Sequence, residues 1–286
     1  MDFDFKSSIE DESVEGLQPN VILLILGVAA LFILPSIFLV PLMLLFPNQD
    51  VELLSYIAYF FGYGSYIVAL GFLIGKDKVK KILKGFNLNN FLVALLFAFL
   101  LYVASILTSN LITTIFGNVD SNANQESLDQ GMMKYTLIVS LFTVVFAPLV
   151  EELVFRFTIF RPIAKKSKVL AYIVSVLTFA GIHFISSLSV LMTDLVNPDI
   201  AQEIAYASFY DDLKTLPIYM VAALILTISY DVNKNIATNI MIHAMYNLSQ
   251  VLIMIFLLKF MNNLDPTISN SSIFESLNYI KLLLIC

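Results

Sequence analysis

The stretch TLIVSLFTVVFAPLVEELVFRFTIF, residues 136–160, decides how the rest of the chain is interpreted. It is apolar enough to cross a bilayer, whose hydrocarbon core of about 30 Å needs roughly 20 apolar residues of helix. It nevertheless contains Glu151, Glu152 and Arg156. Each ionised group near the bilayer centre costs at least about 2.5–3.5 kcal/mol, so such groups usually face a protein interior or a water-filled cavity. The stretch therefore predicts a membrane helix that carries a functional site.

The composition of the whole chain agrees with a membrane location. Of its 286 residues 59% are apolar and 13% are charged, with a mean hydropathy of +0.86, whereas soluble domains have about 45–50% apolar and about 25% charged residues. The only cysteine, Cys286, excludes an intrachain disulfide and a multi-thiolate metal site. We expect the lipid bilayer as a partner and no nucleic acid.

Apolar runs of spanning length follow one another along the chain and predict seven membrane helices. They cover residues 20–46, 51–75, 91–116, 136–160, 168–192, 215–230 and 236–260. Residues 273–286 are shorter and more polar, and predict an interfacial segment or a short final helix. The expected fold is therefore an all-α polytopic bundle of about seven to eight transmembrane helices. Residues 20–120 form its N-terminal helices, and residues 261–286 a C-terminal tail or short final helix.

Lysines and arginines predict the orientation of the bundle. The segment KDKVKKILK after the second run holds five lysines, and residues 156–168 hold five more basic residues. The intervening loops, at 47–50, 117–135 and 193–214, hold almost none. Because basic loops stay in the cytoplasm, residues 1–19 are expected to form an acidic cytoplasmic tail. We expect a multi-pass cell-membrane protein, and the lysine-rich, asparagine-rich, tryptophan-free composition indicates a bacterial plasma membrane.

Helical spacing separates the two glutamates. Glu152 and Arg156 are four residues apart, so they share a face and can pair. Glu151 points about 100° away from Glu152, which leaves one acid free. Pro148 has no backbone N–H, so the carbonyl of Val144 loses its helical partner just before the acids. Such a break is tolerated in a membrane only where protein groups or water satisfy it.

The only two histidines of the chain also lie in apolar runs. His183 follows Phe179 by four residues in FAGIH, and Asn247 follows His243 by four residues in HAMYN. Alone, the Glu–Arg pair is as readily a structural ion pair, and a histidine or asparagine in a span is more often a helix–helix packing residue. Their coincidence on three separate spans favours a shared site built between neighbouring helices.

Three short motifs carry a family resemblance. EELVFR (Glu151–Arg156) fits E-E-x-x-x-R, FAGIH fits F-x-x-x-H and HAMYN fits H-x-x-x-N. In this order on successive membrane helices, they resemble the CPBP family, which contains type II CAAX prenyl endopeptidases and bacteriocin-processing or self-immunity proteases. The resemblance covers roughly residues 130 to 255, which we therefore expect to form the catalytic core.

The resemblance implies an intramembrane endopeptidase that cleaves a peptide or protein substrate within or at the membrane. Its candidate catalytic residues are Glu151, Glu152, His183, His243 and Asn247, with Arg156 and Phe179 in supporting roles. Glu151 would act as general base on water that His183 positions. His243 and Asn247 would donate hydrogen bonds to the oxyanion. Glu152 and Arg156 would hold the helix in place.

Cofactor use and activity stay open at this point. Glu151, His183 and His243 are an acceptable catalytic zinc set, but the same residues also serve a metal-free mechanism. Two other functions use the same residues: a non-catalytic immunity or scaffold protein of the family, and an ion- or proton-coupled transporter. If the site is real, its side chains converge in one cavity, which we expect to open toward the cytoplasm.

The two histidines are predicted to lie at different depths along their spans, which conflicts with their convergence in one cavity. At about 1.5 Å per residue, His183 lies some 22 Å along its span, whereas His243 lies about 10 Å along its own. Convergence then requires this span to begin outside the bilayer or to tilt strongly, and the basic segment that precedes residue 168 favours the first option.

Overall fold

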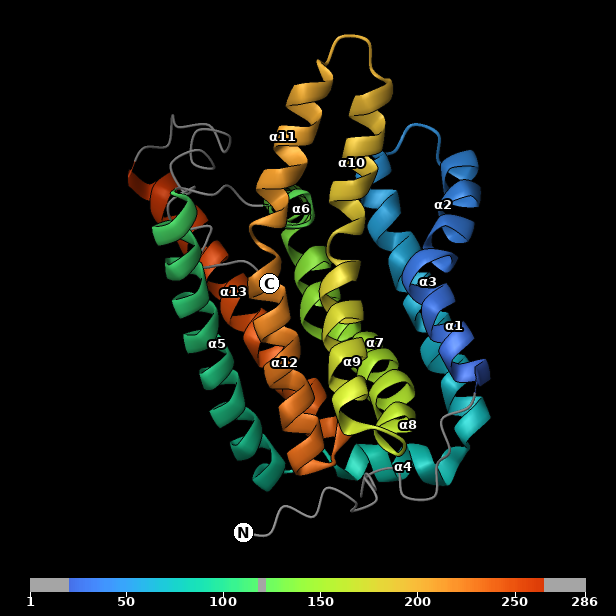
Figure 1. Ribbon diagram of the computed structural model, residues 1–286. Helices are drawn as coiled ribbons and strands as arrows, with labels where there is room; N and C mark the ends of the chain where they lie inside the picture. The colour runs from blue at the N-terminus through green and yellow to red at the C-terminus, as the bar shows by residue number, and fades with distance from the viewer. Residues whose placement is uncertain (1–20, 118–121, 265–286) are drawn as a thin grey trace.

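The computed structural model describes residues 21–117 and 122–264, and within these ranges it contains helices and no strand. The helices pack into a bundle (Figure 1), so the predicted all-α polytopic fold is confirmed. In chain order they are α1 (Val21–Phe32), α2 (Leu34–Leu45), α3 (Val51–Ile74), α4 (Lys76–Lys84), α5 (Leu88–Phe116), α6 (Ala123–Leu141), α7 (Ala147–Glu152), α8 (Arg161–Ala164), α9 (Lys168–Ile182), α10 (Ile185–Val196), α11 (Gln202–Leu213), α12 (Leu216–Asn233) and α13 (Ile236–Leu264).

Five to seven of these helical stretches are long and apolar enough to cross a membrane. Five are single stretches: Val51–Ile74, Leu88–Phe116, Ala123–Ala164, Gln202–Asn233 and Ile236–Phe260. Two more are bent pairs, α1 with α2 at 43° and α9 with α10 at 49°. Together they match the seven apolar runs of the sequence. The segment 273–286 lies outside the described residues.

Two of the predicted loops are wrong in part, because helices extend into them. Most of 117–135 belongs to α6, whose first turn is capped by Asn122: its side chain accepts a hydrogen bond from the backbone N–H of Gln125 at 3.0 Å. Most of 193–214 belongs to α10 and α11, which form a projecting hairpin (Figure 1). These segments are more polar than the spans, so apolar run length did not reveal them.

The stretch 136–160 lies inside one long helical segment, Ala123–Ala164, in which two π-helical segments interrupt the α-helix. Phe142–Phe146 and Leu153–Phe160 are π-helical, on either side of α7. The first π-helical segment lies directly before Pro148, where the sequence predicts a missing backbone hydrogen bond. Such local π-helical turns occur often at functional sites. The buried side chains of α7 and of the segment after it, Val150, Val154 and Phe157 among them, form the centre of the main core.

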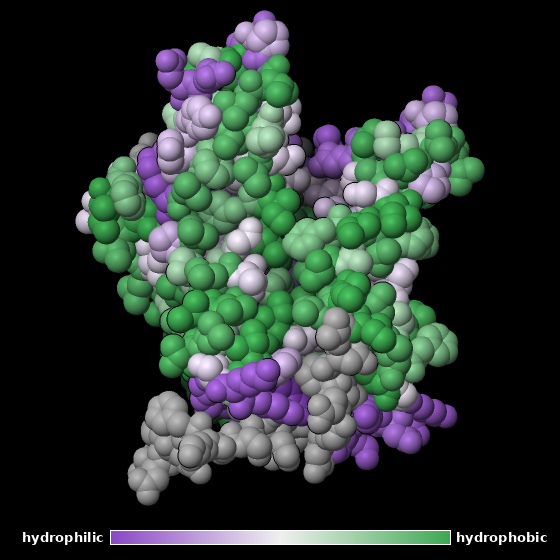
Figure 2. Space-filling view, turned by 45° about the vertical axis from the view of Figure 1, so that its right-hand side comes forward, coloured by the Kyte–Doolittle hydropathy of each residue, from purple (hydrophilic) through white to green (hydrophobic). Residues whose placement is uncertain are grey.

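Lipid-compatible surface covers the outside of the bundle. Large apolar side chains are exposed on nearly every long helix, including Phe72, Phe99 and Leu137. Figure 2 shows this apolar surface over most of one face, with polar residues gathered toward both ends. The lysine-rich segment 76–84 forms α4, which lies across the lower end of the bundle in Figure 1. The chain is therefore a multi-pass membrane protein.

Candidate active site

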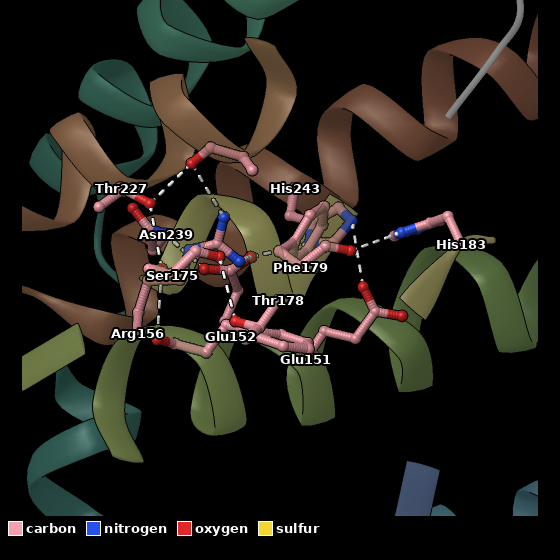
Figure 3. Close-up of polar contacts among 12 residues, drawn as sticks. Glu151, Glu152, Arg156, Ser175, Thr178, Phe179, His183, Thr227, Asn239 and His243 are labelled. Carbon is pink, nitrogen blue, oxygen red and sulfur yellow. Dashed lines mark hydrogen bonds and ion pairs between the residues drawn. The ribbon is translucent and has the colours of Figure 1, made fainter. Parts of the chain in front are cut away.

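Glu152 is the centre of a buried polar cluster. Its side chain is fully buried, and three side chains donate to its carboxylate. Nη1 of Arg156 lies 3.0 Å from Oε1, Nδ1 of His243 lies 2.9 Å from the same oxygen, and Nδ2 of Asn239 lies 2.5 Å from Oε2. Figure 3 shows these contacts. The carboxylate is thus held by two helices, because Arg156 follows α7 and the other two donors belong to α13.

Arg156 is also fully buried and is fixed on three sides. Besides Glu152, its Nη2 donates to the backbone carbonyl of Ala223 on α12 at 3.2 Å. Its Cζ lies 4.4 Å from the centroid of the Phe179 ring, a cation–π contact with α9. The predicted Glu152–Arg156 pair is therefore confirmed. Its charges compensate each other where isolated charges would carry a large desolvation cost.

Glu151 points away from its neighbour, as the helical period predicts. Its side chain lines a cavity and keeps a little exposure, whereas Glu152 keeps none. Oε2 of Glu151 lies 4.0 Å from Nε2 of His243. The imidazole of His243 therefore lies between the two carboxylates, with one ring nitrogen toward each (Figure 3).

His183 lies at the bend between α9 and α10. Its Nδ1 is 2.9 Å from the backbone carbonyl of Phe179, and since a carbonyl only accepts, Nδ1 carries the proton of this bond. Nε2 of the neutral ring is then a hydrogen-bond acceptor. The ring also stacks on Tyr219 of α12, with centroids 4.4 Å apart. Both rings line the same cavity as Glu151.

Asn247 lies one turn beyond His243 on α13 and lines the cavity with it. Its Nδ2 donates to the backbone carbonyl of Thr143 at 2.8 Å. Thr143 belongs to the π-helical segment Phe142–Phe146, so the altered winding of that segment supplies the acceptor. An amide nitrogen has two hydrogens, and one of them stays available for a ligand in the cavity.

The cavity has a volume of about 420 Å³ and brings together Glu151, Phe179, His183, His243 and Asn247. Glu152 and Arg156 do not line it. The convergence in one cavity that the sequence predicts is therefore present in the structure.

The cavity extends toward one end of the bundle. Its lining continues to the first turns of α3 and α6, through the side chains of Glu52, Ser55, Asn124 and Ser127. Those turns lie at the end of the bundle opposite the lysine-rich α4 (Figure 1). Figure 2 shows the surface hollowed between the projecting hairpin and the neighbouring lobe at that end. The cavity therefore extends away from the lysine-rich end, which is the end that the sequence predicts to be cytoplasmic.

The structure brings both histidine rings next to Phe179, although their predicted depths along the spans differ. The first residues of α13, Ile236 and Ala237, are fully buried. A Cβ atom on Gly85, in the turn before α5, would lie 2.7 Å from the Cβ of Ala237. That turn therefore covers the N-terminus of α13, which starts inside the bundle. His243 consequently reaches the level of Phe179, with ring centroids 5.7 Å apart.

Two residues of the site were missed from the sequence. Asn239 precedes His243 by four residues, so the same spacing that selected Asn247 could have found it. Tyr219 carries no such signal, because its contact with His183 is made across two helices. Its hydroxyl accepts a hydrogen bond from Nδ2 of Asn122 at 3.2 Å, which joins His183 to the start of α6.

The expected zinc ligands do not form a metal-binding group as they are arranged. Among the described residues, no three or more His, Cys, Asp or Glu side chains are placed to hold a metal ion. One nitrogen of each histidine already faces a protein oxygen, Phe179 O for His183 and Glu152 for His243.

The bundle places a carboxylate, two imidazoles and an amide around one internal cavity, and side chains of these types can carry general acid–base chemistry. Comparison with protein families identifies the class: residues 133–249 match the model described as Rce1-like, type II CAAX prenyl endopeptidase Rce1-like. This match supports the assignment of residues 133–249 to the CPBP family of intramembrane proteases, as the three motifs predict. Searches of curated proteins and of solved structures gave no match.

Proposed function

We propose that this chain is an endopeptidase that hydrolyses a membrane-associated peptide or protein with water activated by Glu151. The observation that carries the proposal is the position of His243 between Glu152 and Glu151, at 2.9 and 4.0 Å, in a cavity shared with His183 and Asn247. This arrangement separates a fully buried, paired carboxylate from one that faces the cavity. Residues 130–255 form the catalytic core in this proposal, and the family match at 133–249 supports that choice.

The attacking water lies between Glu151 and His183. Glu151 takes one proton of the water, while Nε2 of His183 accepts a hydrogen bond from the other. His183 performs this role because its Nδ1 proton is committed to the carbonyl of Phe179. The water oxygen then attacks the carbonyl carbon of the substrate, and the bond from carbon to the carbonyl oxygen becomes single.

The resulting oxyanion is stabilised from α13. Nδ1 of His243 donates to Glu152, so a hydrogen bond from this ring to the oxyanion uses a proton on Nε2, the nitrogen that faces Glu151 and the cavity. Asn247 supplies its second amide hydrogen, since the first is donated to Thr143. Donors held in place before the reaction stabilise the developing charge without having to reorganise.

Collapse of the tetrahedral intermediate completes the reaction. Glu151, now a carboxylic acid, returns its proton to the leaving amide nitrogen. The carbon–nitrogen bond breaks, and one carboxyl and one amine product leave. Glu152 and Arg156 touch no reacting atom and act by holding His243 and α7.

The decisive experiment uses the purified full chain in detergent and a broad set of membrane and leader-type peptides. The wild type is expected to cleave a subset, and Glu151→Gln is expected to cleave none at a measurable rate. Glu203→Gln, on the exposed surface of α11, is the matched control and should keep wild-type activity. Equal cleavage by wild type and Glu151→Gln would refute this role. An inactive wild type, together with a Glu151→Gln variant that retains its function in cells, would favour a scaffold or immunity protein.

A further inference from the structure

A second, smaller pocket lies between α6 and α13, beside the candidate active site. Its volume is about 40 Å³. It is lined by Gln125, Leu128, Asp129, Met132, Thr143, Gln250, Val251 and Met254. The amide of Gln250 is 7% exposed, and neither its Oε1 nor its Nε2 has a hydrogen-bond partner among the described protein groups. The hydroxyl of Thr143 is likewise without a protein partner in that part of the chain.

The hydrogen-bonding capacity of the Gln250 amide and the Thr143 hydroxyl indicates which ligand the pocket binds. A buried amide needs one partner that donates to Oε1 and another that accepts from Nε2. A metal cation would satisfy only the oxygen and would repel the amide hydrogens. Water both donates and accepts, and one buried water needs about 10–15 Å³ of such volume. The pocket therefore has room for about three water molecules.

The pocket adjoins the site through Thr143 and Leu128, which line both the pocket and the main cavity. The carbonyl of Thr143 holds Asn247, whose own Oδ1 has no protein partner among the described residues. Gln250 lies three residues after Asn247 and so extends the polar face of α13 that includes His243. The polar groups of the pocket thus continue those of the candidate active site.

We propose that this pocket is the binding site for the second substrate, water, and that it supplies Glu151 while a peptide fills the main cavity. This role rests on the proposed function. Each cleavage consumes one water molecule, and an apolar peptide in the main cavity displaces the water there. The pocket lies behind the wall formed by Thr143 and Leu128, so its water stays next to the site.

The first test detects the water directly. Hydroxyl radicals generated from bound water by a brief X-ray pulse oxidise adjacent methionines, and Met132 and Met254 line the pocket while being only 5% exposed. Both are expected to be oxidised in the wild type. Gln250→Leu should lower that oxidation at least about threefold and leave exposed Met192 unchanged. Absence of oxidation at both methionines in the wild type would overturn the water site.

The second test measures the supply of water. Gln250→Leu is expected to lower kcat about tenfold with little change in KM, whereas Gln250→Asn, which keeps an amide, should retain more of kcat. Ser249→Ala is the control, because its hydroxyl donates to the carbonyl of Tyr246 and does not line the pocket. Unchanged kcat in a Gln250→Leu variant that has lost the oxidation would overturn the supply role. If the wild type cleaves no peptide, the proposed function and the supply role fail together, while the oxidation still decides whether the pocket holds water.

Discussion

Nδ1 of His243 lies 2.9 Å from Oε1 of Glu152, so an acid that does not face the cavity fixes the orientation of an imidazole that does. The consequence is a division of labour between two adjacent glutamates. The carboxylate of Glu152 accepts hydrogen bonds from Arg156, Asn239 and His243. Glu151 instead faces the cavity where a substrate would bind.

The two glutamates are expected to respond differently to the same substitution. Glu151→Gln should lower kcat by about 10²–10⁴-fold, the usual contribution of general acid–base catalysis, and leave the melting temperature nearly unchanged. Glu152→Gln leaves Arg156 as an uncompensated buried charge and should cost about 3–5 kcal/mol of stability. Peptide cleavage and thermal unfolding in detergent measure both effects. A stable, fully active Glu152→Gln variant would contradict the division of roles.

Asn239 is expected to act through Glu152. Its Nδ2 donates to Oε2 of that carboxylate inside the bundle. Asn239→Ala removes a hydrogen bond to a charged group and should cost about 1.5–3 kcal/mol of stability. Because His243 then loses part of its orientation, kcat should also fall. The control is Thr114→Ala, whose hydroxyl donates to the backbone carbonyl of Asn110 within α5 and lines neither pocket; equal kcat losses in both variants would argue against a positioning role.

Tyr219 is expected to position His183 by its ring more than by its hydroxyl. Tyr219→Phe keeps the stacked ring at 4.4 Å and loses the hydroxyl contact with Asn122. Tyr219→Leu removes the stack, so it should lower kcat about tenfold, a change of roughly 1.4 kcal/mol in the barrier. The ratio of the two kcat values is the measurement. A larger loss in the Phe variant would show that the hydroxyl carries the effect.

Removal of metal ions is expected to leave activity unchanged. The described residues offer no group of three metal-ligating side chains, and the proposed steps use Glu151, His183, His243 and Asn247 alone. Dialysis of the purified chain against a strong zinc chelator, followed by the peptide assay, tests this expectation. Loss of activity that returns with added zinc would instead support the zinc set Glu151, His183 and His243.

Because α1 lies close to the π-helical segment Leu153–Phe160, a larger side chain at Gly27 is expected to lower the stability of the bundle. A Cβ atom on Gly27 would lie 2.6 Å from Cγ2 of Val154. Gly27→Ala should therefore destabilise the bundle by about 1–3 kcal/mol through overpacking, and Val154→Ala in the same chain should recover part of the loss. Gly64→Ala is the matched control, because nothing lies within 4 Å of its Cβ position. Thermal unfolding distinguishes the three variants.

The spans were predictable because membrane helices are set by a local quantity, the length of an apolar run. All seven runs correspond to helical stretches or bent pairs of the structure. The helices that extend into 117–135 and 193–214 were missed, because their polar residues hide a helix from a hydropathy criterion. The boundaries of these helices depend on capping by Asn122 and on the packing of α10 against α11. Both are contacts in the folded structure, which the residue composition does not reveal.

The sequence by itself determined that the chain spans a membrane, which helices carry the three motifs, and the pairing of Glu152 with Arg156. These follow from apolar run length and the helical period, both of which operate within a few turns of one chain segment. Only the tertiary structure decided that His243 lies between the two glutamates, that Tyr219 supports His183, and that the cavity runs away from the lysine-rich end. Those features depend on where helices begin and cross, as with α13 starting beneath Gly85, and such distances between segments have no signature in local spacing.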